Sequence, residues 1–393
     1  MAGLKRAVIF GAGCIGRGFI GQLLAESGYS LCYLEIKGDL IAALNRRGEY
    51  PLRLVAPSGE AEERVIGPVR ALDAASQEAV SALADCDLAA TAVGAGNLPA
   101  VAPVIAAGAR LRKARDGGPL NVLLCENQMD VHRLMHGLVY AHLFGEERAW
   151  ADENLGLVEP SVGRTVPRPS TEMAAQDPLL LCAEPYAELP ADRAGFRGKI
   201  PEITGLRPDA PFDYYIRRKL FVHNGGHAAC AYLAARKGLT YIWQGAEDHA
   251  IRAAVMAVME VSARALGAAY GEEKGRDAHC LAADLSARFA SHALGDTVVR
   301  VGADPARKLR REDRLIGAAL FALAQGIDPA PLMAPILAAL EFAAPGDPSA
   351  PRVRQLLEEQ GIDAVLTRVM GLRPGEGLYG RIKSAYDAAQ SMH

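Results

Sequence analysis

The sequence lacks the usual features of secreted, membrane-spanning and disulfide-bonded proteins. Its seven cysteines are an odd number and include no Cys-x-x-Cys pair, which favours reduced thiols over disulfides or structural zinc. No uninterrupted apolar run reaches about 18 residues. The first residues run from a charged pair into a short apolar strand, unlike a signal peptide. We therefore expect a cytoplasmic protein with no membrane partner.

The chain also has little net charge. Its 393 residues carry a formal charge of −3, which argues against nucleic acid as a partner, although a local basic patch could still hold a small anion. Half of the residues are hydrophobic and 23% are charged, so the composition supports a large buried core. The length is typical of about two or three domains, and no long internal repeat is present.

Short apolar strands alternate with helical segments in the first part of the chain. The expected strands are 6–13, 31–36, 86–94 and 120–127, with edge strands at 155–167 and 178–185. The expected helices between them include 19–28 and 40–48. Alternation of this kind predicts βαβ units and a parallel sheet.

The hydrophobic pattern of the sequence changes after about residue 195, and most segments beyond this point have a helical pattern. The expected helices are 212–237, 246–270, 277–293, 312–325, 330–342, 351–368 and 376–390. The turn-rich stretch near 190–200 predicts a domain boundary. The fold class expected is therefore α/β, with a Rossmann-type domain with a parallel sheet at 1–195 and a mostly α-helical domain at 196–393.

A glycine motif lies between the first expected strand and helix. Gly11, Gly13 and Gly16 form G-x-G-x-x-G, in which the glycines permit a tight turn, approach of a pyrophosphate and close packing of helix on strand. Glu35 ends the second strand, where a carboxylate binds ribose hydroxyls and favours NAD over NADP. The predicted loop contacts to the cofactor are Gly11, Ala12, Gly13, Cys14, Ile15 and Gly16. Residues 1–195 are therefore the expected NAD-binding domain, which leaves 196–393 as the expected substrate-binding domain. A tight turn without a ligand is the alternative.

Two residues near this loop give less specific signals. Gly94 ends "TAVG" on the carboxyl side of the sheet, where it could admit the cofactor or only begin the next loop. Cys14 lies inside the glycine loop, where a packed small thiol is favoured over a reactive one.

The segment "KLFVHNGGHAACAY", residues 219–232, places two adjacent glycines inside an expected helix, at a cost of about 1 kcal/mol each. Four polar side chains share one arc of roughly 140° on that helix: Lys219, His223, Asn224 and His227. A desolvated lysine can act as a general base, an amide can donate to an oxyanion, and a histidine can orient either partner. Periodicity alone leaves two interpretations open, a catalytic face or a kinked polar helix face.

The motifs resemble those of the polyol-specific long-chain dehydrogenases and reductases, in their branch of shorter chains. The resemblance covers nearly the whole sequence and includes "FGAGCIGRGFIGQLL" (10–24), "CEN" (125–127), "RTVP" (164–167) and "RVGADPARKLRREDRLI" (300–316). The family pattern K-x4-N-x2-H is matched by three residues: Lys219, Asn224 and His227.

The resemblance implies a metal-independent, NAD-dependent oxidoreductase that interconverts D-mannitol 1-phosphate and D-fructose 6-phosphate. Lys219 would remove the alcohol proton, or supply it in the reverse direction. Asn224 would hold the alkoxide together with Asn127, and His227 would position the lysine or the substrate. The glycine pair would then provide clearance for substrate or cofactor. The sequence has no zinc-binding spacing, in agreement with this chemistry.

A basic cluster in the last of these motifs is the candidate phosphate site. Arg300, Arg307 and Lys308 are predicted to bind the phosphate, since arginine's fork suits a dianion. The alternative is a solvated charge cluster that Glu312 and Asp313 partly neutralise.

Four residues depart from the family pattern. Asn is usual at the position of Cys14, Asp at Gly163, an apolar residue at His223 and an acid at Arg217. Two other functions therefore stay open: a dehydrogenase of a non-phosphorylated polyol or hexuronate ketose, and an inactive NAD-binding sensor. The expected oligomeric state is a monomer or a small homo-oligomer.

Overall fold

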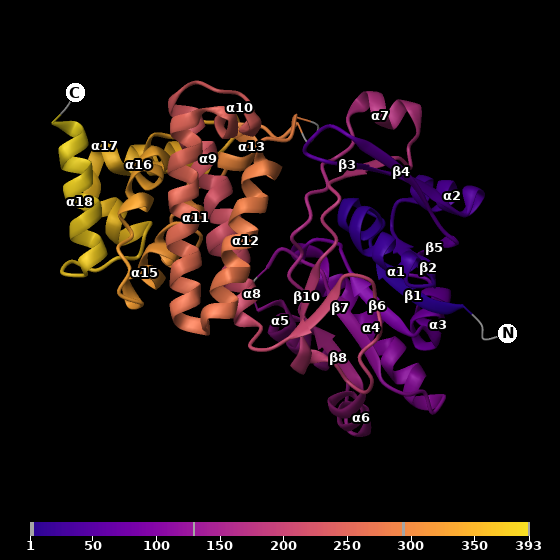
Figure 1. Ribbon diagram of the computed structural model, residues 1–393. Coiled ribbons are helices and arrows are strands. Elements are labelled where there is room, and N and C mark those ends of the chain that lie inside the picture. Colours follow the sequence, from indigo (N-terminus) through magenta and orange to yellow (C-terminus); the bar gives the residue numbers. More distant parts are fainter. Residues whose placement is uncertain (1–3, 129, 293–294, 392–393) are drawn as a thin grey trace. The chain divides into compact units, whose positions relative to one another are not determined.

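A computed structural model describes residues 4–128, 130–292 and 295–391 of the chain (Figure 1). The chain divides into two compact units, Met1–Asp213 and Tyr214–His393, whereas the sequence placed the boundary after residue 195. The later boundary has a local cause. β11 (Leu206–Asp209) pairs in parallel with β10 (Leu189–Asp192), so the segment that contains β11 belongs to the N-terminal unit.

A six-stranded sheet forms the centre of the N-terminal unit, in the order β5-β2-β1-β6-β7-β8, and its neighbouring strands are parallel. Its strands are β1 (Lys5–Phe10), β2 (Tyr29–Glu35), β5 (Val69–Asp73), β6 (Leu88–Thr91), β7 (Leu120–Leu124) and β8 (Leu155–Val158). The strand order reverses between β1 and β6, and such sheets bind ligands at the carboxyl ends of strands beside this switch point. The predicted Rossmann-type fold is confirmed.

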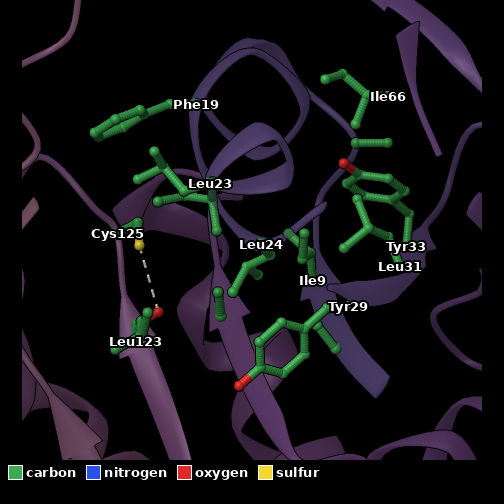
Figure 2. Packing of buried hydrophobic residues seen from close by; sticks show 14 of the residues in the cluster. Ile9, Phe19, Leu23, Leu24, Tyr29, Leu31, Tyr33, Ile66, Leu123 and Cys125 are labelled. Carbon is green, nitrogen blue, oxygen red and sulfur yellow. Dashed lines mark hydrogen bonds between the residues drawn. The ribbon is translucent and has the colours of Figure 1, made fainter. Parts of the chain in front are cut away.

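Both faces of this sheet are buried because its strands are apolar on both sides. In β1, Ile9 packs into one hydrophobic cluster and Phe10 into another, since successive side chains point to opposite faces. A π-helix (Gly16–Gly21), α1 (Gln22–Glu26) and α2 (Gly38–Arg47) contribute to the first cluster. Figure 2 shows part of it, including Phe19 and Leu23 from the π-helix and α1.

The second cluster contains residues of four further helices. They are α3 (Gln77–Asp85), α4 (Leu98–Ala114), α5 (Val131–Tyr140) and α6 (Glu146–Asn154). Leu83 and Ile105 are fully buried members of α3 and α4 in this layer. The two layers enclose the sheet and leave the loops at its carboxyl edge to carry the functional residues.

A second, smaller sheet lies in residues 50–66 and 181–183, although the sequence predicted no strand between residues 36 and 86. β3 (Tyr50–Val55) pairs antiparallel with β4 (Ala61–Ile66) and parallel with β9 (Leu181–Ala183). The expected strand at 178–185 therefore joins this small sheet and not the edge of the main one. β4 is mostly exposed, so it does not need the alternating apolar residues by which a half-buried strand is recognised in a sequence.

The C-terminal unit is helical throughout most of its described residues, 214–292 and 295–391. Its elements are α8 (Asp213–Arg217), a π-helix (Arg218–Asn224), α9 (Gly225–Arg236), α10 (Ile242–Glu247), α11 (His249–Tyr270), α12 (Glu272–Phe289), α13 (Val298–Gly302), α14 (Pro305–Lys308), α15 (Ile316–Ala324), a 3₁₀ turn (Ala330–Leu332), α16 (Met333–Glu341), α17 (Ser349–Arg368) and α18 (Gly377–Gln390). The predicted helical domain is confirmed, and the last residue of the helix expected at 277–293 lies outside the described residues. Figure 1 shows α9, α11 and α12 side by side.

One helix of this unit, α11, is long and apolar enough to cross a membrane by length and composition alone. Its buried residues include Val258, Met259 and Leu266. Because α11 packs against α9 and α12, its apolar composition is accounted for by the core of the unit.

Candidate functional site

The glycine loop follows β1, and the three glycines of its motif have different surroundings. Gly11 has φ +91°, and a Cβ there would lie 2.7 Å from the carbonyl oxygen of Ala92. A Cβ on Gly16 would overlap the carbonyl oxygen of Gly11. Around Gly13, by contrast, a Cβ would meet nothing within 4 Å. The loop is therefore tight at its turn and at its helix, and open at Gly13, where a pyrophosphate can approach the backbone.

Glu35 holds the glycine loop against the end of β2. One of its carboxylate oxygens accepts a hydrogen bond of 2.9 Å from the N–H of Ala12. The other accepts bonds from the N–H groups of Ile36 at 2.9 Å and Lys37 at 3.2 Å. The predicted acid thus lies directly beside the loop, where a dinucleotide needs an acceptor for its ribose hydroxyls. Glycine loop and carboxylate together fit NAD.

Cys14 and Ile15, between the glycines, pack against the hydrophobic cluster of the N-terminal unit. The Cys14 thiol donates a weak hydrogen bond of 3.7 Å to the carbonyl oxygen of Pro167. This environment agrees with the interpretation of Cys14 as a packed thiol, which the sequence favoured over a reactive one. None of the seven cysteines, all of which lie in described residues, forms a disulfide.

A buried carboxylate that the sequence reasoning missed anchors the second loop of this edge. Glu126 follows β7 and accepts hydrogen bonds from the N–H groups of Val93 at 3.0 Å and Gly94 at 2.8 Å. Gly94 has φ +86°, so glycine suits this turn. The signal in the sequence was an acid at the end of an otherwise apolar strand. Asn127, the predicted oxyanion ligand, is the next residue, so Glu126 holds the loops after β6 and β7 together.

The segment with the family pattern begins as a π-helix instead of the expected α-helix. In the π-helix Arg218–Asn224 each N–H bonds the carbonyl five residues back, so residues five apart come closer to one face than on an α-helix. Lys219 and Asn224 are five apart. Both are half-buried, as is His227 on the first turns of α9. π-Helical turns are rare and occur frequently at functional sites.

Asp296 and Phe289 fix the ring of His227. Its Nε2 lies 3.2 Å from a carboxylate oxygen of Asp296, and its ring stacks on Phe289 with centroids 4.8 Å apart. Burial alone would raise the pKa of Asp296, but hydrogen bonds and charge from His227 and Arg300 outweigh it and lower that pKa. Asp296 is thus ionised at neutral pH and can orient the histidine. The sequence reasoning missed Asp296, which is far from His227 along the chain.

His223, on the same helical segment, is held neutral by its surroundings. Burial lowers its pKa well below the ordinary value, and the charges of Arg288, Lys219 and Arg314 act in the same direction, as does His227. A neutral imidazole can accept as well as donate a hydrogen bond. His223 is therefore a neutral member of a group that is otherwise rich in cations.

The two adjacent glycines of this segment, Gly225 and Gly226, face other parts of the protein and not open space. This corrects the expectation that they provide clearance for a ligand. A Cβ on Gly226 would lie 2.6 Å from the sulfur of Met259 on α11. A Cβ on Gly225 would lie 3.1 Å from the carbonyl oxygen of Arg314. Both glycines are buried. They allow α9 to pack closely against α11 and against the segment before α15.

The three predicted phosphate ligands are not one cluster of unpaired cations. Arg300 is exposed, but its Nε donates to Asp296 at 2.5 Å. Arg307 forms ion pairs with Asp304 at 3.0 Å and Asp313 at 3.4 Å. The arginines therefore already have carboxylate partners, and an anion at this place would have to share or exchange them.

Lys308 is the buried member of this set, with 4% of its surface exposed. Its ammonium donates to the carbonyl oxygen of Ala303. Burial, with the nearby charges of Arg314 and Arg307, lowers the pKa of Lys308 to about 8. A buried cation of this kind is unfavourable unless an anion meets it.

The two other departures from the family pattern also have defined surroundings. The guanidinium of Arg217 lies 4.8 Å from the ring centroid of Phe321 on α15. A Cβ on Gly163 would lie 3.0 Å from the ring of Tyr186. Tyr186 thus borders the position where the family has an acid. Among residues 4–128, 130–292 and 295–391, no group of His, Cys, Asp and Glu side chains is arranged to hold a metal ion.

Comparison with known proteins gives matches over the length of the chain. Residues 5–205 match the model of the mannitol dehydrogenase Rossmann domain, and residues 212–390 match that of the mannitol dehydrogenase C-terminal domain. The chain is 36% identical over 377 residues to mannitol-1-phosphate 5-dehydrogenase of Bacillus licheniformis, in a match that covers 95% of this chain and 97% of that protein.

Two solved structures share the fold. A D-sorbitol dehydrogenase in substrate-free form is similar with TM-score 0.75 and 17% identity, over 92% of this chain and 95% of that one. The mannitol 2-dehydrogenase of Pseudomonas fluorescens, in a ternary complex with NAD and D-mannitol, is similar with TM-score 0.73 and 18% identity, over 99% of this chain and 92% of that one.

Proposed function

The chain belongs to the mannitol dehydrogenase family, and we propose that it interconverts D-mannitol 1-phosphate and D-fructose 6-phosphate. It is an oxidoreductase that acts on a CH–OH group, and NAD is its cofactor, which accepts or supplies the hydride. The substrate is proposed from the relative that shares 36% identity over nearly the full length of both chains. The single structural observation that supports this chemistry best is the π-helical segment with Lys219 and Asn224, followed by His227 held by Asp296.

In this proposal Lys219 is the general base that removes the proton from the secondary alcohol as the hydride leaves the same carbon. In the reverse direction the ammonium of Lys219 returns that proton to the carbonyl oxygen. Such proton transfer contributes on the order of a hundred- to ten-thousandfold to a rate. The lysine therefore carries the largest expected loss of any single residue.

The amides of Asn224 and Asn127 are proposed to donate hydrogen bonds to the developing alkoxide. A preorganised donor of this kind contributes about a hundred- to a thousandfold in kcat. His227 is proposed to position Lys219 or the substrate, and Asp296 keeps its imidazole in one orientation. The loop residues Gly11, Ala12, Gly13, Cys14, Ile15 and Gly16, with Glu35 and Gly94, are proposed to bind NAD.

The phosphate is proposed to bind at Arg300, Arg307 and Lys308. Lys308 supports this assignment, because its buried ammonium donates to a backbone carbonyl, forms no ion pair within the described part of the chain, and would gain from a dianion. Arg300 links this site to His227 through Asp296, so a bound phosphate and the orientation of the histidine would share one carboxylate.

Two alternatives lead to different measurements. A dehydrogenase of a non-phosphorylated polyol or hexuronate ketose would oxidise NADH with fructose, fructuronate or tagaturonate in place of fructose 6-phosphate. An inactive NAD-binding sensor would oxidise it with none of them. The departures at Gly163 and Arg217 are the observations that keep a different polyol open.

The test is an NADH absorbance assay of the purified protein against fructose 6-phosphate, fructose, fructuronate and tagaturonate, with two lysine variants. Lys219→Ala should lose at least about a hundredfold in kcat, since it removes the general acid and base, and should bind NADH like wild type. Lys237→Ala, which breaks an exposed ion pair with Asp248 at the end of α9, is the matched control and should keep full activity. Robust turnover by Lys219→Ala would refute the assignment of the lysine.

We further propose that the protein works in the cytoplasm, which agrees with seven cysteines that form no disulfide. Its partner is a small polyol or sugar phosphate, and the expected assembly is a monomer or a small homo-oligomer.

A further inference from the structure

The helix that follows the glycine loop begins with an unusual turn, the π-helix Gly16–Gly21. Three consecutive carbonyl oxygens of this turn each lie within hydrogen-bond distance of a side chain from elsewhere in the fold. The hydroxyl of Tyr33 on β2 is 3.4 Å from the carbonyl oxygen of Gly16, Tyr50 of β3 donates to that of Arg17, and Arg164 donates to that of Gly18. Because a carbonyl oxygen has two lone pairs, these bonds add to any within the helix. The turn is held from three sides.

The two tyrosines act as one unit because their hydroxyls are 2.9 Å apart. Each hydroxyl has a single hydrogen to donate. The hydrogen of Tyr50 goes to the carbonyl oxygen of Arg17 at 2.7 Å. The hydrogen of Tyr33 is then left for the oxygen of Tyr50, or for the more distant carbonyl of Gly16 at 3.4 Å. Tyr33 thus donates to Tyr50, and Tyr50 donates to the helix. Of the two hydroxyls, that of Tyr50 makes the shorter contact with the helix backbone.

This hydroxyl pair is fully buried, and both rings are fully enclosed. Burial raises the pKa of Tyr33 and of Tyr50, so both hydroxyls keep their hydrogens. A Cβ on Gly21 would lie 2.5 Å from the hydroxyl oxygen of Tyr50 and closer still to that of Tyr33. Gly21 therefore provides the space that the pair occupies, which explains a glycine that the nucleotide motif itself does not require.

Arg17 connects this turn to the loop. While its carbonyl accepts from Tyr50, its guanidinium donates through Nε to the carbonyl oxygen of Ala12 at 2.6 Å and through Nη1 to that of Leu179 at 2.7 Å. The Arg17 guanidinium also lies 5.6 Å from the ring centroid of Tyr50. Ala12 is buried and directly precedes Gly13, where the loop is open to a pyrophosphate. A shift of residue 17 would therefore move the backbone that faces the cofactor.

We propose that Tyr50, with Tyr33 behind it, is a positioning residue for the cofactor. The hydroxyl pair holds the π-helical turn, and through Arg17 it holds the loop at Ala12 and Gly13 in the shape that receives the pyrophosphate. The proposal rests on the cofactor and not on the identity of the substrate. It therefore stands or falls by NADH binding, independently of which polyol reacts.

Three tyrosine-to-phenylalanine variants of the full-length protein test the proposal, because each removes one hydroxyl and keeps the ring. Tyr50→Phe should weaken binding of NADH and of ADP-ribose by about three- to tenfold, since it leaves the buried carbonyl of Arg17 without its donor. Tyr33→Phe should weaken both by a smaller factor. Tyr29→Phe is the matched control and should bind like wild type.

Tyr29 suits the control because it is buried in the same strand and on the same face as Tyr33, but faces the ammonium of Lys5, 5.3 Å from its ring centroid. Figure 2 shows both tyrosines, with the hydroxyl of Tyr29 well apart from that of Tyr33. Binding is measured by titration of NADH fluorescence and by competition with ADP-ribose, which contains the pyrophosphate but no nicotinamide. At saturating NADH, kcat should stay at the wild-type value while KM for NADH rises.

A merely structural role would lower the melting temperature of Tyr50→Phe and leave the affinities unchanged. Affinity of Tyr50→Phe within about twofold of wild type for both ligands would overturn the proposal, as would an equal loss in Tyr29→Phe. If Tyr50→Phe does not fold, Tyr33→Phe decides, because it keeps the bond from Tyr50 to the helix. Unchanged affinity in Tyr33→Phe would then count against the hydroxyl pair, and a weaker one in its favour.

Discussion

Single residues set the limits of what could be predicted from the sequence. The glycine loop and Glu35 could be proposed from the sequence because their geometry is local: a strand, a turn and a helix follow each other directly, and β2 returns beside β1. Glu126 and Asp296 were missed because each acts on a residue far away in the chain. Their partners Gly94 and His227 were both recognised. A buried acid thus becomes informative only when the fold shows which group it orients.

Lys308 carries a stability cost that depends on pH. Its pKa in the folded protein is about 8, below the ordinary 10.5, so between these two pH values the unfolded chain holds a proton that the folded one has released. Stability therefore rises with pH across this interval, and the cost is fully present below about pH 8. The variant Lys308→Met lacks this titration. We therefore expect the free energy of unfolding of wild type, minus that of Lys308→Met, to rise by about 3 kcal/mol from about pH 8 to 10.5.

Urea unfolding of both proteins at several pH values from about 7 to 10.5 measures this difference. The tyrosines titrate in both proteins, so their contribution to the two free energies of unfolding cancels in the difference. Parallel curves would show that the Lys308 ammonium keeps an ordinary pKa. An added sugar phosphate provides a second readout, because a dianion bound beside Lys308 should stabilise wild type more than the variant.

Among the described elements, two π-helical turns are features that periodicity could not reveal. The sequence predicts a helix in both places, but the choice between bonds to the fourth and the fifth residue depends on neighbours from elsewhere in the fold. In Gly16–Gly21 those neighbours are tyrosines of β2 and β3 and the buried Arg164. The arc calculated for Lys219, Asn224 and His227 assumed about 100° per residue throughout, and it therefore describes the spacing of these residues only approximately.

The contact between α9 and α11 gives a prediction at this scale. Gly226→Ala favours the helix by about 1 kcal/mol but places a methyl group against buried Met259, and overpacking costs about 1–3 kcal/mol. The variant should therefore lose stability in an unfolding titration. In the background of Met259→Ala the same change should be neutral or stabilising, because the space is then available.

The kinetics of these variants distinguish packing from substrate clearance. If Gly226 made room for the substrate, Gly226→Ala would raise KM for the polyol or ketose, and Met259→Ala would not restore it. We expect the reverse: an effect on stability that the second substitution relieves, with KM close to wild type in every variant that folds.

At the scale of the whole molecule, the chain folds as two compact units, and each contains one of the two tryptophans. Trp150 lies on α6 of the N-terminal unit, and Trp243 lies on α10 of the C-terminal unit, stacked on His292 at 3.9 Å. The class and order of the two domains were predicted from composition and alternation. Their boundary was not, because the pairing of β11 with β10 has no signal in the sequence of either short strand.

The tryptophans allow the two units to be followed separately. In Trp243→Phe the remaining fluorescence reports the N-terminal unit, and in Trp150→Phe it reports the C-terminal one. NAD at about a hundredfold excess over its dissociation constant should stabilise the unit that binds it by about 2.7 kcal/mol. The unfolding midpoint reported by Trp150 should therefore move up further than that reported by Trp243. Equal shifts would show that both units unfold in a single cooperative step.

The π-helical turn between Lys219 and Asn224 also bears on how the length of this segment can vary. A turn of bonds to the fifth residue holds one residue more than a turn of bonds to the fourth, so loss of one residue between Lys219 and Asn224 would let the chain form an ordinary α-helix. The lysine and the asparagine would then be four residues apart and would still share one face of the helix. We therefore expect this segment to accept a one-residue deletion within the turn more readily than an insertion, which would add to a turn that already holds an extra residue.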